Sequence, residues 1–265
     1  MARKKKPPPW KSPPAIGYAQ NPLVQVSCPT YAGKEPVLKE WWEGIKAQTY
    51  TNWQAFCVDN TPRTEAFPGT PYLAVLQGMG IPSIHIQPWL DKPLEQTTFK
   101  RCWELILERA LKDGATWIWS VEADNVPAPE ALDKMLDIAS FAHVHLVTHD
   151  YPLHKSAAEA SGMRGDEFYY TELGCMLMST QLLEGAFRVY EHKLSSAIFL
   201  AAERYRAGWC RMSDLFEVKH LDSYETEFVI TDAWDPDDKS FCPTPSVPDT
   251  FGSKLPDCLA ALVKE

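Results

Sequence analysis

Short runs of apolar residues alternate with longer amphipathic stretches along most of the chain. The apolar runs have the length of β-strands and occupy residues 23–28, 53–58, 83–86, 116–121, 144–148 and 174–179. Between them, apolar residues recur at helical spacing over 35–48, 96–112, 130–140, 181–187 and 195–207. Strands that alternate with helices predict a single α/β domain, in which helices flank a largely parallel central sheet.

Other stretches lack this alternation. Residues 61–82 are rich in Pro and Gly, which predicts a loop with at most one helical turn, and polar residues 149–171 predict an active-site loop. One last strand is expected within 211–220 and a short helix at 256–264. We therefore expect a flexible basic, Pro-rich tail over 1–22, the α/β domain over 23–220, and an acidic, Pro-rich extension over 221–265.

Composition and charge narrow the function classes. The chain has 265 residues, of which 45% are hydrophobic and 23% charged, as in ordinary globular domains. Five basic residues and no acid lie within 1–11; removing their five charges from the net charge of −9 leaves −14 on the remainder. The chain outside residues 1–11 is therefore strongly acidic, which argues against general binding to nucleic acid or anionic membranes. It is compatible with carboxylates that hold a divalent cation.

The cysteines and the start of the chain indicate the cellular compartment in which we expect the protein. Seven Cys, with no CxxC pair, predict buried reduced thiols rather than a disulfide framework. The basic start runs into three Pro instead of an apolar stretch, so no signal peptide is predicted. No apolar run approaches the roughly 18 residues of a membrane span. We expect a cytoplasmic protein without a transmembrane segment; its oligomeric state stays open.

Three of the predicted strands are followed by residues that could contribute to a ligand site. These residues are Pro29–Tyr31, Asp59–Asn60 and Glu122–Asp124. Ligands of open parallel sheets bind at the carboxyl ends of the strands, so these positions are site candidates. Glu122 and Asp124 are two residues apart and can face one point if the chain is extended. Two carboxylates at one point suit Mg²⁺ or Mn²⁺, which also take substrate phosphate oxygens as ligands. A solvated turn is the alternative.

Segment 115–132 (ATWIWSVEADNVPAPEAL) resembles the DxD region of GT-A glycosyltransferases, particularly the large inverting family two. Glu122 stands where the first Asp is usual. Segment 24–60 is similar to the opening block of that family, and 172–179 and 214–220 resemble its later strands. The resemblance implies a Rossmann-like GT-A fold, a nucleotide-sugar donor, most often a UDP-sugar, and Mn²⁺ or Mg²⁺ as cofactor.

The resemblance also implies roles for individual residues. Asp59 would accept a hydrogen bond from the base imide N–H, Asp124 would contact the metal, and His220 would complete the metal site. With Arg101, a basic residue on the predicted 96–112 helix, the nucleotide-sugar-binding candidates are Pro29, Thr30, Tyr31, Asp59, Asn60, Arg101, Glu122, Ala123 and Asp124.

The chain departs from the family at the catalytic base. Inverting members carry an acid shortly before the helix that corresponds to 195–207, whereas Lys193–Ala197 contains none. Glu172, next to the Gly174 strand, is the first substitute, and Glu203 and Glu191 are the alternatives. The base would remove the proton of the acceptor hydroxyl as it attacks the sugar. A hexosyl transfer with inversion is expected.

Two other functions remain open. A nucleotidyltransferase would normally carry a Gly-rich basic loop after the first strand, where this chain has only Ala32–Lys34. A non-catalytic or weakly active nucleotide-sugar-binding protein would account for the missing acid. The acceptor stays open as well: a glycan and a modified nucleic acid, such as DNA with a hydroxymethylated base, are both compatible with the sequence.

Overall fold

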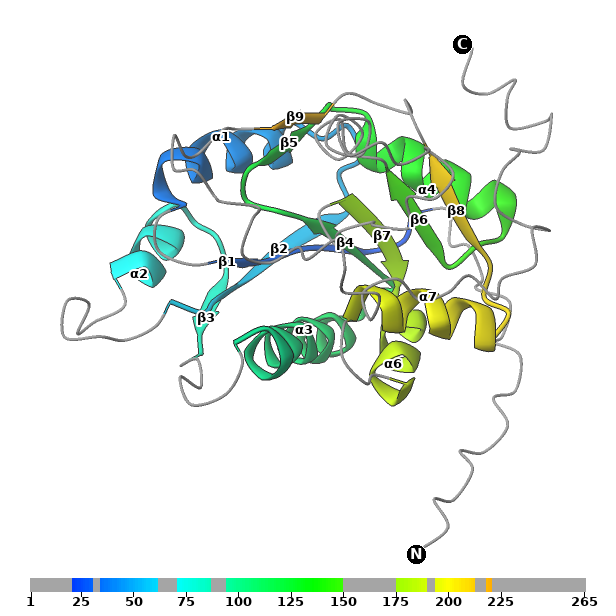
Figure 1. Ribbon diagram of the computed structural model, residues 1–265. Helices are drawn as coiled ribbons and strands as arrows, with labels where there is room; N and C mark the ends of the chain where they lie inside the picture. Colours follow the sequence, from blue (N-terminus) through cyan, green and yellow to red (C-terminus); the bar gives the residue numbers. More distant parts are fainter. Residues whose placement is uncertain are drawn as a thin grey trace, which may run out of the picture.

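A seven-stranded sheet forms the centre of the molecule (Figure 1). The computed structural model describes residues 21–30, 34–61, 71–86, 94–149, 175–189, 194–212 and 218–220. In spatial order the strands run β3-β2-β1-β4-β7-β6-β8. Their bounds are β1 Val24–Thr30, β2 Trp53–Asp59, β3 Ser83–His85, β4 Trp117–Val121, β6 Leu146–His149, β7 Cys175–Ser179 and β8 Trp209–Met212.

Helices cover both faces of the sheet. Helices α1 (Glu35–Lys46), α2 (Pro71–Gly78) and α4 (Ala131–Ala142) lie on one face; α3 (Leu94–Asp113), α6 (Thr180–Val189) and α7 (Leu194–Arg204) lie on the other (Figure 1). The apolar core is divided in the same way, with Trp41, Trp117 and Trp119 on the first side and Trp103 on the second. Burial on both faces explains why the strands are nearly continuous apolar runs. The predicted α/β class with a mostly parallel sheet is confirmed.

Strand direction determines where a site can form. Strands β3, β2, β1 and β4 are parallel to one another, β7 is antiparallel to β4 and β6, and β8 is parallel to β6. The chain moves outward from β1 through β2 to β3 and then returns to place β4 on the other side of β1. A crevice at the carboxyl ends of β1 and β4 is therefore the expected ligand position.

Two sequence predictions were incomplete. The loop expected over 61–82 contains the two-turn helix α2, because Tyr72 and Leu76, one turn apart, are both buried in the core. Residues 211–220 were expected to add one strand, but two strands overlap this stretch. The first is β8, and the second is β9 (Val218–His220), which pairs with the unpredicted β5 (Asn125–Pro127) in a separate two-stranded sheet. Pairing with a distant segment, which local pattern does not reveal, creates β5 and β9.

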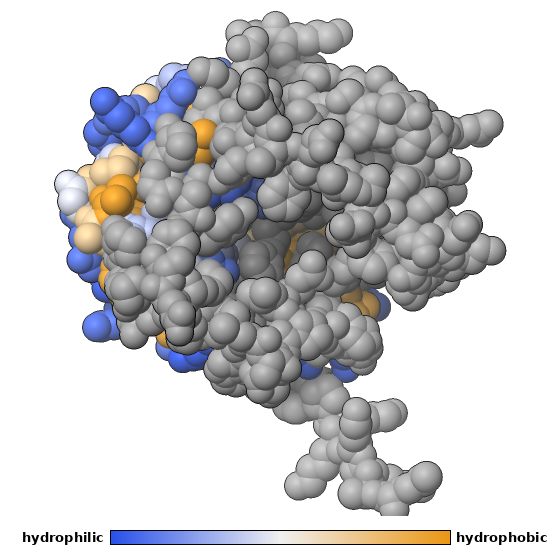
Figure 2. Space-filling view, turned by 60° about the vertical axis from the view of Figure 1, so that its left-hand side comes forward, coloured by the Kyte–Doolittle hydropathy of each residue, from blue (hydrophilic) through white to orange (hydrophobic). Residues whose placement is uncertain are grey.

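Apolar surface is dispersed over the described part of the chain. Its exposed large hydrophobic residues lie on five different elements, and Figure 2 shows hydrophobic residues interspersed with hydrophilic ones on the side that carries α2 and β3. They are Val75, Ile84, Leu111, Phe141 and Leu200. None of the described helices combines the length and the apolar character that crossing a bilayer requires.

Candidate functional site

The end of β1 is fixed by its neighbours. Thr30 is buried, and its Oγ1 lies 2.6 Å from the hydroxyl oxygen of Tyr72 on α2. The backbone N–H of Asn60 donates to the carbonyl oxygen of Thr30 at 2.9 Å, which joins the ends of β1 and β2. Pro29 belongs to the last part of the same strand. Two of the predicted nucleotide-binding segments therefore lie side by side.

Asp59 ends β2 as a buried carboxylate with an incomplete set of hydrogen bonds. Its side chain is 0% exposed, and its Oδ1 accepts a hydrogen bond of 2.9 Å from the backbone N–H of Thr61. Its Oδ2, like Oδ1 of Asn60, is buried and has no hydrogen-bond partner in the part of the chain that the structure describes. Buried polar atoms are nearly always paired, so each such atom is a candidate ligand contact.

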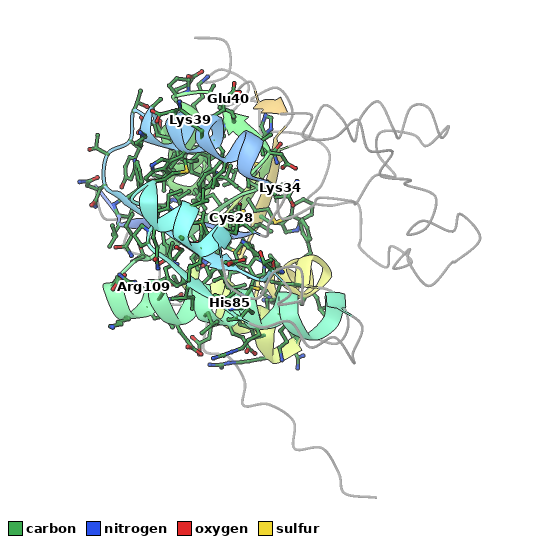
Figure 3. The ribbon with its side chains drawn as sticks, turned by 90° about the vertical axis from the view of Figure 1, so that its left-hand side faces the viewer. Cys28, Lys34, Lys39, Glu40, His85 and Arg109 are labelled. Atoms are coloured by element: carbon green, nitrogen blue, oxygen red, sulfur yellow. The ribbon has the colours of Figure 1, made fainter. Side chains whose placement is uncertain are left out.

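The carboxylates that follow β4 lie beside the end of β1. Asp124 forms an ion pair with Lys34, the residue before α1, and the two side chains are only 13% and 14% exposed. Burial raises the pKa of the Cys28 thiol well above its usual value, and the nearby Cys57 thiol and then the charges of Glu122 and Asp124 add to this effect. Both carboxylates are thus close to Cys28, at the carboxyl ends of β1 and β4. Figure 3 labels Cys28 and Lys34, together with Lys39 and Glu40 of α1.

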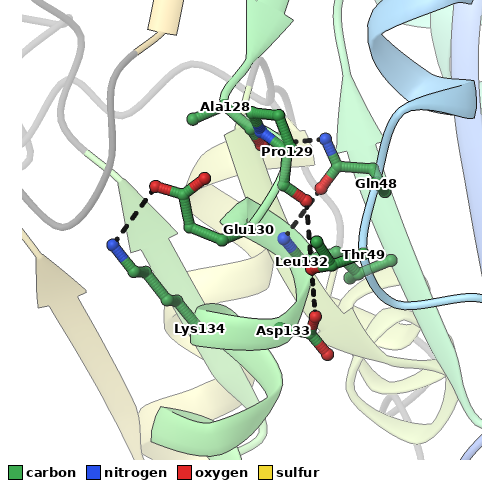
Figure 4. Close-up of polar contacts among 8 residues, drawn as sticks. All are labelled: Gln48, Thr49, Ala128, Pro129, Glu130, Leu132, Asp133 and Lys134. Carbon is green, nitrogen blue, oxygen red and sulfur yellow. Dashed lines mark hydrogen bonds and ion pairs between the residues drawn. The ribbon is translucent and has the colours of Figure 1, made fainter.

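A buried glutamine anchors the segment that leaves this site (Figure 4). Gln48, in the connection from α1 to β2, donates from Nε2 to the carbonyl oxygen of Ala128 at 2.9 Å. Its Oε1 accepts a hydrogen bond of 3.1 Å from the backbone N–H of Leu132 in the first turn of α4. Thr49 adds a backbone hydrogen bond of 2.8 Å to the carbonyl oxygen of Pro129. The chain between Asp124 and α4 is therefore held in place by the connection from α1 to β2.

The two-stranded sheet brings another predicted segment to the same place. In the β5–β9 pairing, His220 is the register partner of Asn125, the residue after Asp124. The backbone of His220 therefore lies next to the carboxylate segment. Its side chain is not described, so its predicted role as a metal ligand stays a prediction. Groups of three or more His, Cys, Asp or Glu side chains that could hold a metal ion are absent from the described residues.

The remaining predicted residues lie elsewhere or outside the described ranges. Arg101 is exposed on α3, where its guanidinium pairs with Glu104 and Glu108 at 3.1 Å each. Glu203 belongs to α7, but its side chain is not described. Tyr31 and Glu172 lie outside the described residues. Their proposed contacts with base and acceptor stay predictions.

Lys34 and Tyr72 shape this edge but were not predicted as site residues, and Gln48 was predicted only as part of the segment that resembles the family's opening block. Each acts through a partner 42 to 90 positions away in the sequence, in Thr30, Asp124 or Leu132. The only available signals were a lysine directly before a Pro-led helix and a glutamine directly after that helix. Neither pattern identifies a partner so distant in the chain.

Comparison with known proteins finds neither a matching family model nor a matching curated protein. Among solved structures, the chain is similar to the mannosyltransferase PcManGT from Pyrobaculum calidifontis in complex with GDP-Man and Mn²⁺, with 17% identity over 79% of this chain and a TM-score of 0.51. It spans 59% of that mannosyltransferase chain. At this identity the likeness shows a shared fold, which agrees with the predicted GT-A architecture.

Two structures of S. aureus TarS are also similar to this chain. The first has 14% identity over 75% of this chain and 60% of that chain, with a TM-score of 0.48. The second, in complex with UDP-GlcNAc, has 14% identity over 72% of this chain and 56% of that chain, with a TM-score of 0.46. These TM-scores are too low to support an argument.

Proposed function

We propose that this protein is a metal-dependent glycosyltransferase that transfers a hexosyl group from a nucleotide-sugar donor, most simply a UDP-sugar, to an acceptor hydroxyl. One observation carries the proposal: the ends of β2 and β4, on either side of β1, present the buried Asp59 and the Glu122–Asp124 pair. Two interstrand spacings separate these strands by about 10 Å. A nucleotide laid across the end of β1 would reach Asp59 with its base and Asp124 with its diphosphate.

The residues present fit a divalent cation. Asp124 offers hard carboxylate oxygens, and its pairing with the ammonium group of Lys34 marks this carboxylate as a place where positive charge is stable. Mg²⁺ and Mn²⁺ are commonly held by one or two carboxylates plus substrate phosphates, so a cage of three protein ligands is not required. Asp124, with Glu122 and His220 as further candidates, would hold the ion. When bound, it would supply charge neutralisation to the leaving diphosphate. The similar mannosyltransferase was solved with GDP-Man and Mn²⁺.

The protein's own contribution would be positioning and proton transfer. Asp59 would fix the base by accepting its imide N–H, and the Thr30–Asn60 connection would hold the nucleoside pocket in place. Glu172 would take the proton of the acceptor hydroxyl as that oxygen attacks the anomeric carbon from the face opposite the diphosphate, which inverts the configuration. Glu203 is the alternative base. Both assignments rest on position in the sequence, because the acid that inverting members carry before the helix that corresponds to 195–207 is missing from Lys193–Ala197.

A donor-hydrolysis screen tests the proposal. Purified protein is incubated with UDP-, GDP-, ADP- and CDP-sugars in the presence of Mn²⁺, and release of the nucleoside diphosphate is measured. We expect turnover with at least one donor, loss of that turnover with EDTA, and a decrease of at least about a hundredfold in Asp124→Ala, as for removal of a main electrostatic group. Asp137→Asn, which alters an exposed carboxylate on α4, is the matched control and should retain activity.

The outcomes separate the competing functions. Donor binding without turnover, together with full binding in Glu172→Gln, would support the non-catalytic alternative. Formation of a nucleotide sugar from a nucleoside triphosphate and a sugar phosphate would support a nucleotidyltransferase. Equal donor hydrolysis by the original protein and Asp124→Ala would contradict the site proposed here.

A further inference from the structure

We infer that Lys34 competes with the divalent cation for Asp124 and moves to the donor diphosphate when the donor binds, so that metal and nucleotide bind in a coupled manner. This inference rests on the proposed function. It concerns a residue to which the family resemblance gives no role, and it makes a prediction about the protein before any donor is present.

Lys34 and Asp124 form an ion pair that is shielded from solvent. The ammonium of Lys34 contacts Oδ2 of Asp124, and solvent reaches only 14% and 13% of the two side chains. Oδ1 of the same carboxylate lies 3.4 Å from Nδ2 of Asn125. Two cations at one shielded carboxylate repel each other strongly, because there is little water between them to screen the charges. A metal ion can therefore bind Asp124 fully only after the ammonium has moved away.

The position of Lys34 allows that movement. Its carbonyl oxygen is held at the start of α1, where it accepts hydrogen bonds from the backbone N–H groups of Val37 at 3.1 Å and Leu38 at 3.0 Å. Its backbone is fixed, but its four-carbon side chain can turn without disturbing the helix. Lysine is also a common point-charge partner of phosphate. A diphosphate at the crevice between β1 and β4 would thus offer the ammonium a new partner as the metal takes Asp124.

Two consequences follow. Metal alone should bind weakly, because it must displace the ammonium without giving it another anionic partner. Metal and diphosphate together should each strengthen the binding of the other, since coupling between two sites is reciprocal. Removing the positive charge of Lys34 should therefore strengthen the binding of metal alone and weaken the binding of nucleoside diphosphate.

Titration with Mn²⁺ alone, with free Mn²⁺ counted by electron paramagnetic resonance, tests the inference. The proteins are the original chain, Lys34→Met, Lys34→Gln and the matched control Lys39→Met, which alters an exposed lysine within α1. Lys34→Gln retains a hydrogen-bond donor for Asp124, and circular dichroism verifies that each variant is folded. We expect both Lys34 variants to bind Mn²⁺ on the order of tenfold more tightly than the original chain, and Lys39→Met to match it.

A second titration, with UDP at saturating Mn²⁺, should show weaker UDP binding in both Lys34 variants and no change in Lys39→Met. Unchanged or weaker Mn²⁺ binding in folded Lys34 variants would overturn the inference. If Asp124→Ala nevertheless loses Mn²⁺ binding, the proposed function stands and only the role of Lys34 is wrong. If Asp124→Ala binds Mn²⁺ as the original chain does, the proposed metal site itself is wrong.

Discussion

At the scale of single residues, Asp59 combines complete burial with an unsatisfied carboxylate oxygen in the described part of the chain. A buried charge in this state is costly for the folded protein alone. A ligand that donates a hydrogen bond to Oδ2 would recover part of that cost. Uracil and guanine carry an imide or amide N–H that can donate in this way, whereas adenine and cytosine offer a ring acceptor at the corresponding position.

Asp59→Asn tests this account of base recognition. The asparagine can still accept a hydrogen bond from the backbone N–H of Thr61, but its second polar atom becomes a donor that faces the donor of the base. UDP affinity should fall about tenfold to a hundredfold, as expected for loss of a buried hydrogen bond to a charged group. Calorimetric titration measures it, with Asp137→Asn as the control that leaves affinity unchanged. Equal UDP affinity in Asp59→Asn would remove Asp59 from the nucleotide site.

His145 gives the protein a predictable response to acid. It is buried, its Nδ1 lies 2.9 Å from Oγ of Ser179, and burial lowers its pKa. Because the unfolded chain then binds more protons than the folded one, stability should decrease as pH falls below about 6.5, the usual histidine value, toward the lowered pKa. Denaturant unfolding at pH 7.5 and 5.5 should show a smaller loss of stability in His145→Gln. The exposed His143, altered to Asn, should leave the loss unchanged; an identical loss in His145→Gln would contradict the assignment.

The sequence could predict the carboxylates but not their partners. Asp59 and Asp124 follow apolar runs, and parallel strands end at a common edge, so local pattern was enough to predict their positions. Lys34 was not recognised because its partner lies 90 positions away in the chain. Ion pairs across such separations depend on the folded backbone, and a single sequence contains no direct signal for them.

At the scale of elements, Gln48 caps the N-terminus of α4, although it lies outside that helix. The N-cap residue of α4, Glu130, makes no side-chain capping hydrogen bond, and the N–H of Leu132 is satisfied by Gln48 instead. Gln48→Met keeps the side-chain length but leaves that N–H and the carbonyl oxygen of Ala128 without this partner. We expect a loss of about 1–3 kcal/mol in the free energy of unfolding. Gln77→Met, on the exposed side of α2, is the control and should change it by less than about 0.5 kcal/mol.

Helix α1 and strand β5 approach each other through a glycine. A Cβ on Gly44 would lie 2.4 Å from Cγ1 of Val126, a stiff β-branched side chain next to the carboxylate segment. At a solvent-exposed position inside a helix, Gly→Ala stabilises the folded protein by about 1 kcal/mol. Gly44→Ala should instead destabilise it by about 1–3 kcal/mol, because the added methyl group overpacks this contact. Adding Val126→Ala should relieve the clash, so the two changes should not be additive.

Urea unfolding of the two single variants and the double variant measures this coupling. Gly78→Ala is the matched control, because nothing lies within 4 Å of the position where its Cβ would be. It should be neutral or stabilising. A stabilised Gly44→Ala variant would show that α1 and β5 are further apart than this structure places them.

The elements that the sequence predicted well are the ones whose own pattern is strong. Helices α1 and α3 carry long apolar stripes, and their predicted bounds differ from the observed ones by at most two residues at each end. Helix α2 follows a Pro- and Gly-rich stretch, and β5 and β9 have three residues each, so their existence depends on tertiary contacts. The prediction lacked α2 and β5, whereas β9 lies within 211–220, where one last strand was expected.

At the scale of the whole molecule, the strand order produces the site. Placing β4 beside β1, after the chain has moved outward to β3, brings carboxylates from two separate stretches of sequence to the same edge of the sheet. The alternation of strands and helices predicted a sheet with mostly parallel strands. It could not predict the order or the antiparallel insertion of β7, because pairing between strands is non-local. The fold class was thus predictable, while the contacts within the site required the structure.

A ligand that bridges these strand ends should stabilise the folded molecule as a whole. At a concentration of one hundred times its Kd, a ligand that binds only the native state adds about 2.7 kcal/mol. For a chain of 265 residues, each kcal/mol of added stability raises Tm by about 2–4 °C. We therefore expect UDP with Mn²⁺ to raise Tm by roughly 5–10 °C. Asp59→Asn and Asp124→Asn, scanned at the same ligand concentrations, should lose about half of this rise or more, because each removes a contact at one end of the bridge. Asp137→Asn should retain it. Strands β2 and β4 flank β1. If only one variant loses the rise in Tm, the nucleotide binds at that strand end and does not reach the other. If both variants keep the full rise, the nucleotide binds at another surface.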